Sequence, residues 1–100
     1  MTPEDKQRDY KLRSRYGITL DKYNDMLQRQ QGRCGICKRL ATDFKKHLAV
    51  DHNHRTGFCR GLLCPFCNTM LLKYLRDNKA LARGLVAYLQ DALHNDIDWE

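Results

Sequence analysis

Apolar residues recur at helical spacing in the segment after residue 18, with polar residues between them. The apolar face consists of Leu20, Tyr23, Met26 and Leu27. Thr19 lies directly before this face and can cap a helix, and Gly32 is a typical C-terminal stop. The pattern therefore predicts an amphipathic helix over residues 19–32 whose apolar face packs in the core.

The segment before this helix has a clear helix start but few apolar residues. Thr2 suits the N-cap, Pro3 suits the first helical position, and Asp5 follows three residues after the cap. We expect the helix to end near Gly17. Because its apolar residues are sparse, we expect it to be loosely attached or to lie on a charged partner.

The centre of the chain favours strands. Residues 48–51 and 58–63 are interpreted as two short strands, joined as a hairpin through the turn residues Arg55-Thr56-Gly57. Residues 68–75 look helical, and Asn78 can cap a last helix. That helix carries an apolar stripe, expected to pack on the core or on a second protomer: Leu81, Leu85, Tyr88, Leu89 and Ala92.

The charge balance favours a polyanionic partner. The 100 residues include 18 Lys or Arg and 12 Asp or Glu, a net charge of +6, and the excess lies in the first two thirds of the chain. No apolar run approaches the roughly 20 residues that cross a bilayer, and the first residues show no apolar signal core. We therefore expect a cytoplasmic protein without a membrane partner.

Four of the five cysteines form two C-x-x-C pairs, Cys34 with Cys37 and Cys64 with Cys67. Two such turns can close a tetrahedral thiolate cage, which suits Zn²⁺. A redox pair or an iron–sulfur site is the alternative, but a redox motif needs no second matching pair. A closed cage has no open position, so we predict structural zinc that stabilises a small core. Cys59 is interpreted as a small strand residue.

The D-H-N-H run at residues 51–54 lies between the cysteine pairs, and Asn68 directly follows the second pair. The oxygens of Asp51 and Asn68 suit a hard divalent ion, and a neutral His52 can accept a proton from water. Metal-assisted phosphodiester hydrolysis needs these groups. His52 and His54 would share a strand face. The alternatives are that the Asp–His pair is surface decoration and that His54 supports the turn.

These segments resemble the recombination endonuclease VII family of HNH (ββα-metal) nucleases. The matching stretches are YGIT at 16–19, GRCGIC at 32–37, VDHNH at 50–54 and RGLLCPFCN at 60–68. The resemblance implies a hairpin and helix that hold one Mg²⁺ or Mn²⁺ ion through Asp51 and Asn68. It also implies that His52 is the general base, that His54 contacts phosphate or helps at the metal site, and that the four paired cysteines bind structural zinc.

The resemblance also implies a DNA substrate, because the founding phage enzyme of the family is an intertwined dimer that resolves branched DNA. We expect double-stranded or branched DNA as the partner, and the choice between monomer and homodimer stays open. Phosphate contacts are expected from basic residues near the knuckles and the hairpin: Arg33, Lys38, Arg39, Lys45, Lys46, Arg55 and Arg60. Lys11, Arg13 and Arg15 can add a helical arm.

The fold prediction is a small α+β protein of one domain. A zinc-stapled ββα-metal (HNH) core over residues 33–75 lies between a basic helical arm at 1–32 and a C-terminal helix at 76–100. The predicted function is a metal-dependent DNA endonuclease, nicking or structure-selective in the manner of a Holliday-junction resolvase. The alternatives are a non-catalytic, zinc-stabilised DNA-binding module and a zinc domain that binds protein.

Overall fold

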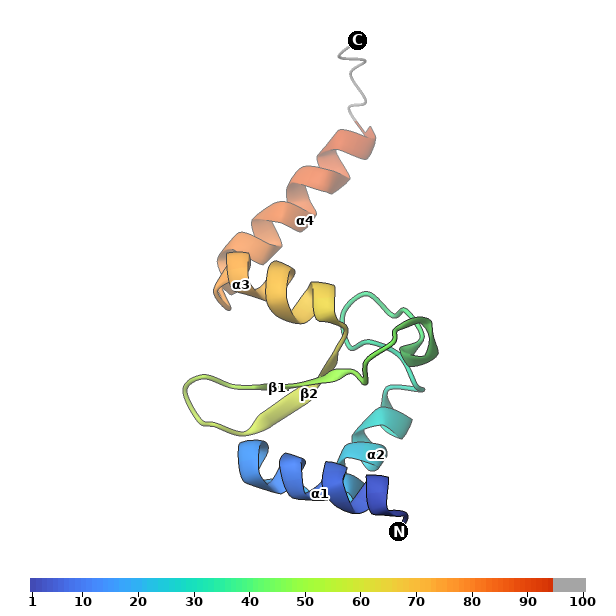
Figure 1. Ribbon diagram of the computed structural model, residues 1–100. Coiled ribbons are helices and arrows are strands. Elements are labelled where there is room, and N and C mark those ends of the chain that lie inside the picture. Colours follow the sequence, from blue (N-terminus) through green and yellow to red (C-terminus); the bar gives the residue numbers. More distant parts are fainter. Residues whose placement is uncertain (95–100) are drawn as a thin grey trace.

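The computed structural model describes residues 1–94, and of residues 91–94 only the backbone (Figure 1). The elements follow in the order α1 (Pro3–Tyr16), α2 (Leu20–Arg29), η1 (Ala41–Asp43), β1 (Ala49–His52), β2 (Cys59–Leu63), η2 (Cys67–Leu71), α3 (Leu72–Leu75) and α4 (Lys79–His94). The helices and the antiparallel pair confirm the α+β class. The last residues of the predicted C-terminal segment, 95–100, lie outside the described residues.

The first two helices begin at the predicted capping residues. The Thr2 hydroxyl accepts the Asp5 N–H at 3.1 Å, and the Thr19 hydroxyl accepts the Lys22 N–H at 3.0 Å. Each hydroxyl thereby satisfies a backbone donor that the helix leaves free. α1 ends as expected at Gly17, whose left-handed φ of 70° suits a residue without a Cβ atom.

α2 ends earlier than predicted, at Arg29 rather than near Gly32. Gln31 and Gly32 both have positive φ values, 58° and 70°, and the Gly32 N–H bonds back to the Leu27 carbonyl at 2.9 Å. The glycine is thus part of the closing turn and not of the helix.

α1 is attached to the rest of the protein more firmly than its composition suggested. Leu12 and Tyr16 pack against the buried core. The Asp9 carboxylate accepts the Leu20 N–H at 2.8 Å, which joins α1 to the first residue of α2, and also pairs with Arg13 at 2.7 Å. Of the two alternatives expected for this helix, loose attachment is contradicted, because two apolar residues and one carboxylate dock it. A charged partner for it stays a prediction.

The two strands pair antiparallel, with bounds close to those predicted. The register places Asp51 opposite Gly61 but His52 opposite Cys59. Arg60 is therefore an extra residue on β2, a β-bulge. Such a bulge changes the direction of nearby side chains, and here it lies beside the Asp–His run.

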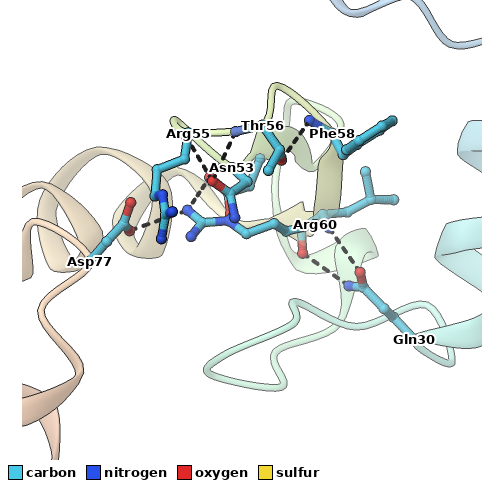
Figure 2. Close-up of polar contacts among 9 residues, drawn as sticks. Gln30, Asn53, Arg55, Thr56, Phe58, Arg60 and Asp77 are labelled. Atoms are coloured by element: carbon cyan, nitrogen blue, oxygen red, sulfur yellow. Dashed lines mark hydrogen bonds and ion pairs between the residues drawn. The ribbon is translucent and has the colours of Figure 1, made fainter.

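The hairpin turn is built around Asn53. Its side-chain oxygen accepts the N–H groups of Arg55 and Thr56 at 2.8 and 3.3 Å (Figure 2). Gly57, at φ 79°, donates its N–H to the Asn53 carbonyl at 2.7 Å. This Asx turn confirms the predicted turn residues and assigns Asn53 a structural role.

The core lies where α2, the hairpin and the cysteine turns meet. Leu62 is fully buried, and the Gln30 side chain bonds both its N–H and its carbonyl, at 2.8 and 2.9 Å. The Tyr23 hydroxyl donates to the Leu48 carbonyl at 2.6 Å. The other buried residues are Leu20, Cys34, Val50, Leu63, Cys64 and Cys67.

α4 extends away from this core (Figure 1). Its start is confirmed, because the Asn78 side chain accepts the Leu81 N–H at 3.0 Å. The predicted stripe does not pack on the core: Leu81 is 52 % and Leu85 46 % exposed, and the side chain of Ala92 is outside the described part. The radius of gyration is consequently 17.0 Å, against about 13 Å for a compact domain of this length. None of the helices within residues 1–94 is long and apolar enough to span a membrane.

Candidate metal centre and adjoining groove

The four cysteines of the two C-x-x-C turns converge on one point. Their sulfur atoms all lie within 4.8 Å of one another, and Cys37 Sγ lies 3.7 Å from Cys64 Sγ. Two sulfurs bound to one tetrahedral zinc at about 2.3 Å would be ~3.8 Å apart. The predicted ligand set Cys34, Cys37, Cys64 and Cys67 is therefore positioned to bind a structural metal such as zinc.

Backbone N–H groups point at the sulfur atoms. Cys34 Sγ accepts N–H groups from Cys64 and Ile36 at 3.3 and 3.5 Å. Burial acts to raise the pKa of the Cys34 thiol, but these donors outweigh it and lower the pKa to about 6. Burial, followed by the neighbouring thiols, raises the pKa of Cys67. Metal ions such as Zn²⁺ bind the deprotonated form of cysteine, the thiolate. A cation that favours thiolates therefore suits this set of ligands.

Cys59 lies apart from this cage, half-buried in β2. Burial raises the pKa of its thiol, with a smaller contribution of the same sign from Asp51. A thiol of raised pKa is a poor nucleophile at neutral pH. These properties agree with the interpretation of Cys59 as a small strand residue.

A groove of about 800 Å³ runs beside the cage between the hairpin and the η2–α3 segment. Four residues of the predicted site line it together: Asp51, His52, His54 and Asn68. Asn68 lies in the π-helical turn η2, and its N–H bonds to the Cys64 carbonyl at 3.0 Å. The cysteine turn thus fixes the position of Asn68, as its place in the sequence suggested.

His52 lies close to two other rings in this groove. Its ring centre is 5.3 Å from that of His54 and 6.3 Å from that of Tyr16 on α1. The proximity of the two histidines agrees with the expected shared face. The Nδ1 atom of His52 is buried, and no residue among 1–94 hydrogen-bonds to it. One imidazole nitrogen is therefore not committed to the protein.

Asp51 is paired with Arg60, a residue that the sequence predicted to contact DNA phosphates. Arg60 Nε donates to Asp51 Oδ2 at 2.8 Å, and Nη2 donates to Asp51 Oδ1 at 3.2 Å. The same Nη2 donates to Asp77 Oδ1 at 3.2 Å (Figure 2). The hydrogen bond to Asp51 is the main reason that the pKa of Arg60 is raised. Arg60 thus bridges two carboxylates at the bulge.

The other predicted DNA contacts are spread over the surface. Arg55 and Arg60 line a second pocket of about 580 Å³, whose lining shares Leu72, Arg76 and Asp77 with the groove. Arg33 donates to the Lys38 carbonyl at 3.0 Å, and Lys38 donates to the Gly35 carbonyl at 3.1 Å, so both brace a cysteine turn. The remaining three are exposed and line neither cavity: Arg39, Lys45 and Lys46.

Sequence reasoning missed several residues of the groove. They are Tyr16, Thr69, Leu72, Lys73, Arg76 and Asp77. Helical spacing from Asn68 was a usable signal for some of them, because Leu72, Lys73 and Arg76 follow at four, five and eight residues. Asp77 follows the end of α3 and no periodicity indicated it.

Fold and site define a small α+β protein in which four cysteines are positioned to bind a metal beside a groove of acid, imidazole and amide groups. The chain belongs to the recombination endonuclease VII family, whose model matches residues 9–91.

Two phage proteins are similar to the chain. It is 47 % identical to the Gene 59 protein of Mycobacterium phage L5 over 74 residues, which cover 74 % of this chain and 44 % of that protein. It is 44 % identical to the Gene 59 protein of Mycobacterium phage D29 over 75 residues, which cover 75 % and 45 %. The matched part is thus less than half the length of these relatives. No solved structure matches the chain.

Proposed function

We propose that the chain is a metal-dependent DNA endonuclease that hydrolyses phosphodiester bonds in the groove beside the cysteine cage. Membership of the recombination endonuclease VII family supports the class of reaction. The observation that carries the site is the common lining of one groove by Asp51, His52, His54 and Asn68, which come from two separate segments. These residue types together provide oxygen ligands and a base.

The donor set fits a hard divalent cation. Asp51 offers a carboxylate and Asn68 an amide oxygen, the ligands that Mg²⁺ and Mn²⁺ prefer. Such a cation, when bound, stabilises the negative charge that develops on the phosphate and on the leaving oxygen. Asp51 shares its oxygens with Arg60, so cation and guanidinium compete for the same carboxylate.

His52 is the proposed general base. A neutral imidazole accepts a proton from water near neutral pH, and the buried Nδ1 of His52 has no hydrogen-bond partner among the described residues. The rings of Tyr16 and His54 lie on the groove beside it and restrict its orientation. His54 is proposed to contact the phosphate, and Lys73 and Arg76 on the facing wall are further candidates for that contact.

The arrangement leads us to interpret β1, β2 and the η2–α3 segment as a ββα-metal (HNH) core within residues 33–75. The arm at 1–32 and the C-terminal segment at 76–100 would complete one domain around it. The proposed substrate is double-stranded or branched DNA, and its phosphate contacts are expected to weaken as salt rises. Mg²⁺ or Mn²⁺ would serve in the groove, while Zn²⁺ in the cage has a structural role.

Plasmid nicking with Mg²⁺ or Mn²⁺ tests this proposal, comparing the wild type with His52→Ala. Loss of the base is expected to reduce cleavage by about 100-fold or more. His47→Ala is the matched control, because His47 is exposed and does not line the groove. Zinc content and circular dichroism are measured for every variant, so that misfolding is recognised. Equal cleavage by His52→Ala and wild type would exclude His52 as the base.

A non-catalytic DNA-binding module is the second candidate function. One observation favours it: both Asp51 oxygens accept hydrogen bonds from Arg60, so a protein side chain already occupies this carboxylate. If zinc-loaded wild type binds plasmid and branched DNA at low salt but cuts neither, this function replaces the nuclease.

A further inference from the structure

We propose that Asp77 is a positioning residue for the cation site at Asp51, and that it acts through Arg60, which the two carboxylates share. The inference rests on the proposed binding of a divalent cation by Asp51. Asp77 is not part of the Asp–His–Asn set, and it is separated from Asp51 by 25 residues of chain.

The geometry makes one Arg60 nitrogen common to both acids. Nη2 lies 3.2 Å from Asp51 Oδ1 and 3.2 Å from Asp77 Oδ1, while Nε lies 2.8 Å from Asp51 Oδ2. The Asp51 side chain is only 12 % exposed, whereas those of Arg60 and Asp77 are 34 % and 35 % exposed. Arg60 therefore lies at the more open side of Asp51.

The backbone holds Asp77 in this place. Arg76 and Asp77 have successive φ values of 52° and 57°, a left-handed conformation that is uncommon for residues other than glycine. The Arg76 N–H bonds to the Leu72 carbonyl at 2.8 Å, and the Asn78 N–H bonds to the Leu75 carbonyl at 2.9 Å. The sharp junction between α3 and α4 thus turns the Asp77 carboxylate toward the bulge on β2.

A cation at Asp51 takes the oxygens that Arg60 holds and repels the guanidinium. With Asp77 present, Arg60 keeps an acidic partner when it releases Asp51, so the release costs less. Without the Asp77 charge, Asp51 is the only acidic partner of Arg60 among the side chains that the structure describes, and Arg60 competes more strongly with the cation. Removal of Arg60 eliminates the competitor. The two substitutions are therefore expected to change cation affinity in opposite directions.

A direct attraction between Asp77 and the cation is the competing explanation. It also predicts weaker cation binding when the Asp77 charge is removed, but the loss would persist in a protein without Arg60. A relay through Arg60 makes the effect of Asp77 disappear in that background. The double-mutant cycle of Asp77→Asn and Arg60→Gln separates the two explanations.

The measurement is Mn²⁺ binding to the zinc-loaded protein without DNA, followed by the electron paramagnetic resonance signal of free Mn²⁺. Asn tolerates the left-handed backbone at position 77, so Asp77→Asn changes charge and little else. We expect Asp77→Asn to weaken binding by roughly three-fold or more, Arg60→Gln to tighten it, and the double variant to match Arg60→Gln. Asp43→Asn is the charge control, because Asp43 is exposed and outside the groove.

Asp51→Asn separates failure of the inference from failure of the proposed cation site. If Asp51→Asn abolishes Mn²⁺ binding and Asp77→Asn does not change it, only the relay is wrong. The relay is also wrong if Asp77→Asn weakens binding equally with and without Arg60. If wild type binds no Mn²⁺, or binds it equally well after Asp51→Asn, the cation site itself is wrong and the relay with it.

Discussion

α2 and α4 carry the same kind of apolar stripe in opposite surroundings. In α2, Leu20 and Tyr23 are 4 % and 3 % exposed, whereas in α4 Leu85 and Leu89 are 46 % and 54 % exposed. Helical periodicity shows that a helix has an apolar face, but it does not identify what covers that face. The hairpin and the cysteine cage cover the apolar face of α2. Within residues 1–94 the apolar stripe of α4 stays half exposed.

Polar contacts account for much of this difference. Hydrogen bonds hold α2 and the residue after it on the sheet region. The Tyr23 hydroxyl donates to the Leu48 carbonyl, and the Gln30 side-chain amide bonds both the N–H and the carbonyl of Leu62. The hydrogen bond that the Asn78 side chain accepts from the Leu81 N–H stays within the start of α4 itself. A small core of this kind relies on directed bonds and has four cysteines positioned to bind a metal, because its apolar area alone is modest.

Removal of zinc is the change with the largest expected effect on this comparison. Structural zinc contributes about 10–16 kcal/mol of binding free energy in small domains, which equals or exceeds the usual stability of about 5–15 kcal/mol. Chelation, or Cys64→Ser, is therefore expected to unfold the core and release α2. Circular dichroism and zinc stoichiometry during a chelator titration measure this. A cooperative melt that survives full zinc loss would contradict it.

The comparison between buried and exposed stripes is sharpest for one pair of leucines. Leu62→Ala is expected to destabilise the protein by about 2–5 kcal/mol, because Leu62 is fully buried. Leu85→Ala is expected to change stability by no more than about 0.5 kcal/mol. Urea denaturation of both zinc-loaded variants measures the difference. A large cost for Leu85→Ala would mean that its face is covered in solution.

Tyr23→Phe tests the hydrogen bond that fastens α2. The loss of a buried donor to the Leu48 carbonyl at 2.6 Å is expected to cost about 1–2 kcal/mol. Tyr10→Phe is the matched control, because Tyr10 on α1 is 72 % exposed. Equal urea midpoints for wild type and Tyr23→Phe would show that this bond does not hold the helix.

Asp9 gives a smaller, pH-dependent test of how α1 joins α2. Bonding to the Leu20 N–H, assisted by Arg13, lowers the pKa of Asp9 below its ordinary value of 3.8. A lowered pKa in the folded state stabilises the protein above that value, and the contribution is lost as the pH falls through the folded pKa. The melting-temperature difference between wild type and Asp9→Asn is therefore expected to shrink on acidification.

This difference is measured on both proteins at each pH, so that the effect of pH on the cage is common to both. A difference that stays constant as the pH falls well below 3.8 would exclude the Asp9 contribution.

Local signals in the sequence were sufficient for much of the fold. The caps at Thr2, Thr19 and Asn78 act within three residues, and the structure confirms all three. The convergence of the four paired cysteines was also predictable, because each C-x-x-C turn is local and one metal needs both pairs. The position of Asn68 beside the cage follows from the same argument.

What the sequence did not reveal depends on contacts between distant residues. The bulge at Arg60 and its pairing with Asp51 require the register of two strands, and one inserted residue changes that register. The docking of α1 through Asp9 depends on the angle between α1 and α2, because Asp9 must reach the Leu20 N–H. The exposure of the α4 stripe depends on where α3 ends, which the backbone at Arg76 determines.

The Gln30 bonds have a consequence for solubility. A two-stranded sheet consists of edge strands alone, and free N–H and carbonyl groups on an edge invite another chain to add as a further strand. In the middle of β2, Gln30 occupies both groups of Leu62, and the Gly35 N–H also bonds the Leu62 carbonyl at 3.0 Å. One glutamine thus takes the place of a third strand at the middle of the outer β2 edge, which disfavours the addition of another chain there.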